Sequence, residues 1–239
     1  MKRTLLGRAL AERDAGRPAA MVTDLASGAQ ALCTPTLCEG DLALSPAALA
    51  VVRQALRDDR AGMADAAGSK LFVQIFNPPL RLILVGAVHI SQALAPIAAL
   101  AGYRVTVVDP RRSFASEARF PGVELVAEWP EEAMAALAID SRTAVVTLTH
   151  DPKLDDPALQ AALRSPAFYV GALGSRKTHA GRLKRLAAAG FAADETARIH
   201  GPVGLAIGAL SPAEIAISIL AEITAVLHRA LPAPAEAAA

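Results

Sequence analysis

The stretch RLILVGAVHISQALAPIAALAGYRVTVVDPRR, residues 81–112, decides the fold. Its first five residues form a short apolar run rich in branched side chains, which is typical of a buried parallel strand. Gly86 ends this run, and small apolar residues with a helical pattern follow at residues 89–101. A second apolar run, residues 104–108, ends at Asp109. The order strand, turn, helix, strand predicts a Rossmann-type mononucleotide-binding half.

The first turn of this unit departs from the dinucleotide-binding fingerprint. The pattern G-x-G-x-x-G would place glycine at positions 86, 88 and 91, but the chain has Gly86, Val88 and Ser91. The helix after the turn still offers free N–H groups to an anion, and Asp109 lies near the spacing at which an acidic residue accepts a ribose hydroxyl. Many chains of this topology bind another ligand or none. The candidate ligand contacts in this unit are Gly86, Ala87, Val88, His89 and Asp109.

Two arginines follow Asp109 directly. Arg111 and Arg112 come just past the end of the second strand, which places them at the edge of the expected crevice. Arginine pairs with a phosphate or carboxylate through two parallel hydrogen bonds. Arg111 is therefore a candidate ligand contact, and the alternative is a solvated loop.

Size and composition limit the possible classes of protein. The 239 residues suffice for one large or two small domains, and 53% of them are hydrophobic while only 4% are aromatic. A net charge of +1 gives no general attraction to nucleic acid or to an acidic membrane. No apolar run approaches the roughly 20 residues that span a bilayer, and the charged start does not resemble a signal peptide. We expect a soluble cytoplasmic protein without nucleic-acid or membrane partners.

The only two cysteines, Cys33 and Cys38, lie five residues apart without a C-x-x-C pattern or a nearby histidine. This spacing argues against a zinc site. Nothing in the sequence indicates export, so we expect two ordinary thiols, or one reactive thiol, rather than a disulfide.

The region before residue 77 has a different organisation from the rest. We expect an N-terminal helix, hairpin strands at residues 18–25 and 29–33, and a helix that Ser45 caps and Pro46 opens. A second hairpin is expected from residues 62–66 and 69–76, and acidic residues in the turns are expected to be solvated. These elements predict a small α+β domain.

Two prolines, in Asn77-Pro78-Pro79, mark the boundary between domains because they exclude helix. The predicted organisation is a small α+β N-terminal domain, residues 1–76, and a Rossmann-like C-terminal domain with a parallel sheet, residues 77–230. Residues 231–239, LPAPAEAAA, are expected to form a disordered tail. The fold class is α/β.

Further strands are expected at residues 123–127, 143–149 and 167–170. His150 and Asp151 follow the second of these, at the carboxyl end of a parallel strand, where open α/β sheets bind ligands. His150 there can donate or accept a hydrogen bond, or act as an acid or base. Asp151 is better explained as a cap, and the next helix is expected to follow Pro157. The segment Ser211-Pro212-Ala213-Glu214 predicts a capping box that opens the last helix.

A second glycine-containing turn, GALGSRKTH, begins at Gly171. It is not a Walker A loop, because Arg176 occupies the place of the last glycine. Cations at a helix N-terminus oppose the helix dipole, so an anionic ligand explains them better than helix stability does. A solvated basic patch is the alternative. The candidate phosphate or carboxylate contacts are Gly174, Ser175, Arg176 and Lys177.

Three stretches together resemble one family. They are VGAVHISQALAPIAALAGYRVTVVDPR, LTHDPKLDDPALQAALRSPAFYVGALGSRKTHAGRLKRL and RIHGPVGLAIGALSPAEIAISILAEI. The chain is similar there to the XdhC/CoxI family, the xanthine dehydrogenase accessory proteins. The resemblance covers residues 77–230, and the N-terminal region is similar to the short variant of that family's first domain.

The resemblance implies a Rossmann-type domain in a cytoplasmic protein that serves molybdenum hydroxylases. Such a protein binds the molybdenum cofactor, a molybdopterin, and hands it to a xanthine dehydrogenase-type apoenzyme. The link to cofactor sulfuration implies a cysteine desulfurase as a possible second partner, and the sequence leaves a homodimer open.

Two other functions remain open. One is an NAD(P)-dependent oxidoreductase, with Asp109 on the ribose and His150 as acid or base, although the altered glycines and the lack of a Tyr-x-x-x-Lys motif count against it. The other is an adaptor between a molybdoenzyme and a sulfur donor. A chaperone without catalytic or metal-binding residues is the function we expect.

Overall fold

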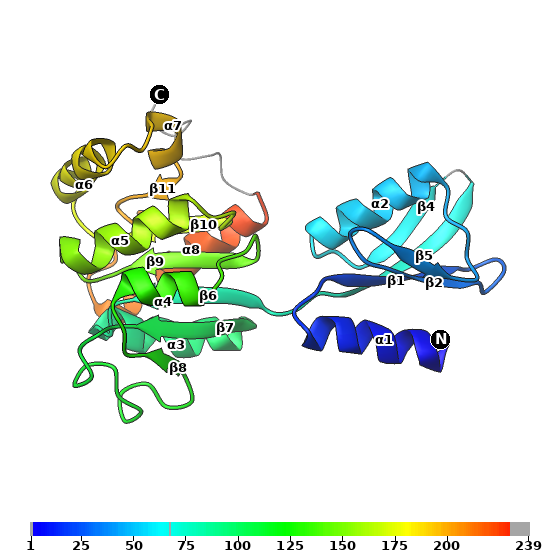
Figure 1. Cartoon of the computed structure of the whole chain (residues 1–239), viewed down its shortest axis with the longest axis horizontal. Coiled ribbons are helices and arrows are strands. Elements are labelled where there is room, and N and C mark those ends of the chain that lie inside the picture. The colour runs from blue at the N-terminus through cyan, green and yellow to red at the C-terminus, as the bar shows by residue number, and fades with distance from the viewer. Residues whose placement is uncertain (1, 67, 230–239) are drawn as a thin grey trace. The chain divides into compact units, whose positions relative to one another are not determined.

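The structure, a computed structural model, describes residues 2–66 and 68–229 (Figure 1). The chain divides into two units, Met1–Pro78 and Pro79–Ala239. This division falls within the Asn77-Pro78-Pro79 segment in which the sequence places the domain boundary. The expected tail, residues 231–239, lies outside the described residues.

The N-terminal unit is an antiparallel sheet of five strands in the order β3-β2-β1-β5-β4. The central strand β1 is buried on both faces over its first four residues, which explains the apolar run AAMV at its start. Ala20 and Val22 pack with Val52 of α2 on one face, and Ala19 and Met21 pack with α1 on the other. The strands are β1 Ala19–Asp24, β2 Gln30–Cys33, β3 Cys38–Gly40, β4 Gly62–Ala66 and β5 Ser69–Phe76, and the helices are α1 Arg3–Asp14 and α2 Pro46–Arg57.

A disulfide joins Cys33 to Cys38, so the expectation of two ordinary thiols is wrong. The two residues face each other at the end of the β2–β3 hairpin, with their Cα atoms 4.1 Å apart. The turn between them is closed by the Thr34 N–H, which donates to the Leu37 carbonyl at 2.7 Å. A spacing of five residues on its own does not show that the chain reverses between them, and the pairing register of the hairpin brings the sulfurs together.

Two acidic residues near this hairpin do more than contact solvent. Glu39 forms an ion pair with Arg8 of α1, and Asp41 forms one with Lys2. Asp41 also accepts a hydrogen bond from the Gln30 N–H at 2.9 Å. These contacts hold the start of the chain against β2 and β3.

The C-terminal unit contains a parallel sheet of six strands in the order β11-β10-β9-β6-β7-β8. Within this unit the first strand, β6, lies between the second, β7, and the fourth, β9, which is the doubly wound order of a Rossmann fold. The strands are β6 Leu80–Val85, β7 Tyr103–Val108, β8 Glu124–Val126, β9 Thr143–Thr147, β10 Tyr169–Ala172 and β11 Ile199–His200.

Helices cover both faces of this sheet (Figure 1). Leu82 and Leu84 of β6 pack toward α3 and α8, while Ile83 and Val85 pack toward α4, α5 and α6. A strand buried on both faces reads as a continuous apolar run, which is why the segment quoted above predicts the fold. The helices are α3 His89–Leu100, α4 Pro130–Ala136, α5 Pro152–Leu163, α6 Arg176–Ala188, α7 Ala193–Thr196 and α8 Pro212–Leu227.

The helix after β9 begins earlier than expected. α5 starts at Pro152, and Pro157 lies inside it rather than before it. Asp151 caps this helix by accepting a hydrogen bond from the Lys153 N–H at 2.9 Å, as the sequence predicts for that residue. Proline is tolerated in the first turn of a helix, so Pro152 is the true opening signal. Asp155 is consequently buried on the helix instead of preceding it.

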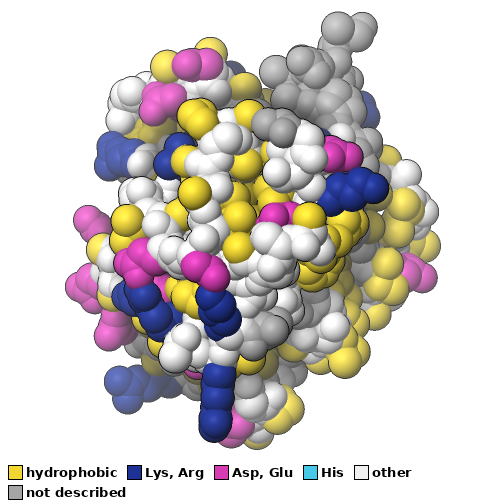
Figure 2. Space-filling view, turned by 90° about the vertical axis from the view of Figure 1, so that its right-hand side faces the viewer, with side chains coloured by type: hydrophobic (Ala, Val, Ile, Leu, Met, Phe, Trp, Pro, Cys, Tyr) yellow, Lys and Arg dark blue, Asp and Glu magenta, His cyan; other side chains and the backbone are white. Residues whose placement is uncertain are grey.

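The surface and the helices fit the composition. On the face drawn in Figure 2, hydrophobic side chains lie among lysine, arginine, aspartate and glutamate side chains, so neither sign of charge covers it. Within the described part of the chain, every helix is too short or too polar to cross a bilayer.

Candidate functional site

The candidate site is the edge of the parallel sheet where its strands end. The strand order reverses between β6 and β9, and open α/β sheets bind ligands outside the carboxyl ends of the strands at such a point. The turns that start at Gly86, Asp109, Thr149 and Gly174 all follow strands of this sheet. Parallel pairing places these turns along one edge.

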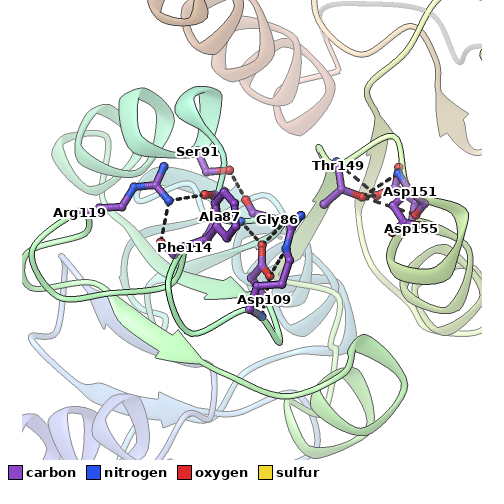
Figure 3. Close-up of polar contacts among 10 residues, drawn as sticks. Gly86, Ala87, Ser91, Asp109, Phe114, Arg119, Thr149, Asp151 and Asp155 are labelled. Carbon is purple, nitrogen blue, oxygen red and sulfur yellow. Dashed lines mark hydrogen bonds and ion pairs between the residues drawn. The ribbon is translucent and has the colours of Figure 1, made fainter.

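Gly86 closes the gap between the turns after β6 and β9. Its φ of 110° is a conformation that favours glycine. A Cβ at this position would overlap the Cγ2 of Thr149, so the two turns approach each other as closely as the atoms permit. Figure 3 shows Gly86 and Thr149 on neighbouring turns of the crevice. The first glycine of the fingerprint is thus required by the protein itself, whether or not a ligand is bound.

The other two fingerprint positions have structural explanations. Ser91 is fully buried, and its hydroxyl donates a hydrogen bond to the Gly86 carbonyl, so it ties the start of α3 to the turn. Val88 is half-buried against the core and occupies the N-cap position of α3 without forming a side-chain cap. His89 is exposed at the first position of that helix. The N–H groups of the first turn of α3 are therefore not capped by the residue before it.

Asp109 is fully buried and bound within the protein. Its carboxylate accepts hydrogen bonds from the Ala87 N–H at 2.8 Å, from the Arg111 N–H at 2.9 Å, and from the Arg111 guanidinium at 2.9 and 2.7 Å. Burial acts to raise the pKa of this carboxyl, but the hydrogen bonds from Arg111 and Ala87 outweigh it and hold the pKa below its ordinary value. Asp109 thereby links the turn after β6 to the loop after β7 (Figure 3).

Arg111 remains partly available on the solvent side. Its side chain is 41% exposed and its guanidinium lies 4.6 Å from the centre of the Phe114 ring. The pKa of Arg111 is raised, first by its hydrogen bond to Asp109 and to a smaller extent by the charge of Asp151 after β9. The loops after β7 and β9 are therefore within electrostatic reach of each other. Arg112 is exposed.

Arg119 is a site residue that no sequence pattern singles out. Its guanidinium donates to the Ala87 carbonyl at 3.0 Å and to the Phe114 carbonyl at 2.8 Å (Figure 3). It also donates to Gln92 Oε1 at 2.9 Å. It fastens the loop after β7 to the first turn and to α3. The partners lie up to 32 residues away in sequence, and no local pattern marks such a contact.

The turn after β9 presents His150 to solvent. His150 is exposed and has a φ of 63°, which is uncommon for a residue with a side chain. Below it, the Thr149 hydroxyl donates to Asp155 at 2.7 Å, and Asp155 forms a buried ion pair with Arg182 of α6 at 3.6 Å. Burial raises the pKa of the Asp155 carboxyl, because hydrogen bonding to Thr149 and the charge of Arg182 compensate only in part.

The turn after β10 combines a capped helix with exposed cations. Gly174 has a φ of 141°, and a Cβ there would lie 2.9 Å from Thr178 Cγ2. Ser175 caps α6 by accepting a hydrogen bond from the Thr178 N–H at 3.1 Å. Arg176 and Lys177 occupy the first two positions of α6 and are exposed.

Some of the predicted site residues contact one another in the structure, whereas others only lie along the same edge of the sheet. Ala87, Asp109 and Arg111 form one hydrogen-bonded group. Residues 174–177 lie at the same edge of the sheet, but within the described residues no hydrogen bond joins them to that group or to His150. No group of three potential metal ligands occurs in the described part of the chain.

The chain is similar to a known protein family and to several known proteins. Residues 82–223 match the model of the XdhC Rossmann domain. The molybdenum cofactor insertion chaperone PaoD of Escherichia coli is 37% identical over 155 residues, which are 64% of this chain and 42% of PaoD. A protein of Bacillus subtilis described as a probable xanthine dehydrogenase subunit is 34% identical over 156 residues, 65% of this chain and 45% of that protein.

A solved structure supports the same assignment. A crystal structure from Bacillus halodurans described as a xanthine dehydrogenase aligns with a TM-score of 0.74 and 25% identity, covering 95% of this chain and 67% of that one. The chain spans less than half the length of the two curated relatives. Because the family match covers more than half of the chain and includes the whole crevice, this chain belongs to the XdhC family.

Proposed function

We propose that this protein binds the molybdenum cofactor and delivers it to a molybdenum hydroxylase of the xanthine dehydrogenase type. The observation that carries the proposal is the 37% identity to a molybdenum cofactor insertion chaperone over 155 residues of the chain. The relative described as part of a xanthine dehydrogenase supports the class of client enzyme.

The crevice is chemically suited to such a cargo. Molybdopterin carries a phosphate, and its dinucleotide forms carry two. The uncapped start of α3 offers N–H groups, and the start of α6 offers the cations Arg176 and Lys177. β6 and β10 are separated by one strand, so the turns that follow them lie roughly 10 Å apart along the edge, with α3 and α6 on opposite faces of the sheet. One ligand of dinucleotide length can reach both.

NAD(P) is the second candidate ligand, favoured by the strand order alone. In that case Asp109 would accept a ribose hydroxyl. Its carboxylate is instead fully buried and already bound by Ala87 and Arg111, so that role would require it to release one of them.

A binding and transfer experiment tests the proposal. The purified chain is mixed with cofactor released from a molybdoenzyme and passed over a gel-filtration column, and the retained pterin is oxidised and identified by its fluorescence. We expect near-stoichiometric retention, followed by activation of a cofactor-free xanthine dehydrogenase-type enzyme on mixing. Retention of NADH without any pterin would overturn the proposal.

A further inference from the structure

Three side chains outside the sites described so far form a connected group. Tyr169 of β10 donates its hydroxyl hydrogen to Glu222 Oε2 of α8, and the Gly204 N–H donates to the same oxygen at 2.9 Å. The other oxygen of Glu222 lies 3.3 Å from Nδ1 of His200, the last residue of β11. The rings of Tyr169 and His200 stack with their centres 4.6 Å apart.

Glycines make room for this group. Gly171 of β10 pairs with His200 of β11, and a Cβ on Gly171 would lie 2.8 Å from the Tyr169 ring. The tyrosine ring therefore lies along its own strand toward the carboxyl edge. Gly204 has a φ of 95°, and a Cβ there would overlap the Ser218 hydroxyl of α8, so the loop after β11 lies directly on that helix.

The protonation states of the group follow from its contacts. Burial acts to raise the pKa of Glu222, but hydrogen bonds from His200, Tyr169 and the Gly204 N–H lower it below its ordinary value, so the carboxylate is ionised. Burial and the neighbouring carboxylate raise the pKa of Tyr169 well above 10, so its hydroxyl keeps its proton. Nδ1 of His200 lies beside this ionised carboxylate, which can only accept hydrogen bonds, so the contact favours a proton on Nδ1.

This arrangement favours one tautomer of His200. When Nδ1 carries the proton of a neutral imidazole, Nε2 carries a lone pair and accepts hydrogen bonds. No residue in the described part of the chain hydrogen-bonds to Nε2, and the side chain retains 11% exposure. A histidine that contacts a ligand through one ring nitrogen is commonly oriented by a carboxylate at the other nitrogen.

We propose that His200 is a ligand-recognition residue, whose Nε2 accepts a hydrogen bond from an N–H or O–H group on the heterocyclic ring of the bound cofactor. This inference deepens the proposed function and rests on it for the identity of the ligand. Glu222 and Tyr169 are positioning residues, because they act through His200.

The position of His200 suits one end of an extended ligand. β11 lies directly beside β10, so His200 is roughly 5 Å along the edge from the turn that carries Arg176 and Lys177. The next residue, Gly201, packs against the ring of His179 in the first turn of α6. Pterins and nucleobases carry N–H groups on their ring edges, so a ligand with its phosphate at α6 can place a ring donor at His200.

The first test examines the tautomer in the protein without ligand. Of the five histidines, His200 is assigned in ¹⁵N-histidine spectra as the resonance that disappears in His200→Asn. We expect the Nδ1–H tautomer in the wild type and a shift toward Nε2–H in Glu222→Gln. A wild-type His200 protonated at Nε2 would overturn the proposal.

The second test measures binding of cofactor released from a molybdoenzyme. In His200→Asn the amide can still donate to Glu222, but nothing replaces Nε2, so we expect about tenfold weaker binding together with a small drop in melting temperature from the loss of the ring stacked on Tyr169. The exposed His228 at the end of α8 provides the matched control His228→Asn, which should bind as the wild type does. Equal affinity of His200→Asn and the wild type would contradict the role of His200 while leaving the proposed function intact. If the wild type retains no cofactor, the proposed function fails instead, and the tautomer measurement still decides whether His200 presents an acceptor.

Discussion

The turns after β6 and β10 have the same order of strand, glycine and helix but opposite chemistry. The first ends in Val88, which provides no cap, and the Ala87 N–H is already bound by the protein's own Asp109. The second is capped by Ser175 and places Arg176 and Lys177 on the first turn of α6. The first turn has open backbone donors and no lysine or arginine among its own residues, and the second has cations and a satisfied cap.

The two turns contribute differently to the crevice, because the first provides a fixed shape and the second provides charge. The turn after β6 is held on three sides, by Thr149, Asp109 and Arg119, so its geometry is set before any ligand arrives. The turn after β10 contributes charge on two exposed side chains that can adjust to a ligand. We therefore expect changes at the first turn to act on the stability of the fold, and changes at the second to act on binding.

The largest effect is expected for Gly86→Ala. The new Cβ would overlap Thr149 Cγ2, and the φ of 110° is unfavourable for alanine. Thr149 cannot simply rotate away, because its hydroxyl is bound to Asp155. We expect a loss of about 3 kcal/mol in the free energy of unfolding, measured by urea denaturation.

Two variants separate the collision from the backbone strain. Gly102→Ala places a Cβ at a φ of 90° with no atom within 4 Å, so it should cost only about 1 kcal/mol. Adding Thr149→Ser to Gly86→Ala removes the colliding methyl group and keeps the hydroxyl, and should recover part of the loss. Equal losses for Gly86→Ala and Gly102→Ala would show that the close approach of the two turns is not required.

The second-largest loss of stability is expected for Asp109→Asn. The amide cannot accept all of the hydrogen bonds from Ala87 and Arg111, and we expect a loss of about 2 kcal/mol at pH 7. The pKa of Asp109 is lowered in the folded protein, so its stabilisation is fully present above its unfolded pKa of about 4 and is lost as the pH falls through the folded value. The stability difference between wild type and variant should shrink on acidification below about pH 4. Arg112→Ala, at the exposed neighbouring arginine, should leave stability unchanged.

The sequence predicts those parts of these turns that local chemistry determines. The helix Pro46–Arg57 begins where Ser45 and Pro46 place it, and the caps Asp151 and Ser211 are confirmed. The start of α5 differs from the prediction because Pro152 and Pro157 both satisfy the local rule for a helix opening, and only packing of the buried Asp155 distinguishes them.

Contacts between distant segments are not predictable in the same way. The disulfide depends on the register of β2 and β3, and the roles of Arg119 and Glu222 depend on partners in other elements. The sequence predicts that Asp109 contacts a ligand. Spacing alone does not reveal that its carboxylate is instead bound by Ala87 and Arg111. The assignment of ligand contacts within the crevice stays a prediction.

Variants of the two N-cap residues test the comparison of the two turns through smaller changes in stability. Ser175→Ala removes the acceptor for the Thr178 N–H and should cost about 1 kcal/mol. Val88→Thr keeps the side-chain shape and adds a hydroxyl at the uncapped N-cap of α3, so stability should rise by up to about 1 kcal/mol. If the open donors of α3 hold the cofactor phosphate, this hydroxyl competes with it, and Val88→Thr should reduce cofactor retention whereas Val88→Ala should not.

The smallest effect on stability, and the clearest effect on binding, is expected for Arg176→Ala and Lys177→Ala. Cations at a helix N-terminus oppose its dipole, so their removal should leave the melting temperature unchanged or slightly raised. Cofactor affinity should fall several-fold in each variant at low salt, and the difference from the wild type should narrow at about 1 M salt, because exposed charges are screened there. Lys184→Ala removes an exposed cation of the same helix far from its start and should bind as the wild type does. Equal weakening by Lys184→Ala would mean that α6 attracts the cofactor through its general charge, and the division between a shaped turn and a charged turn would then be wrong.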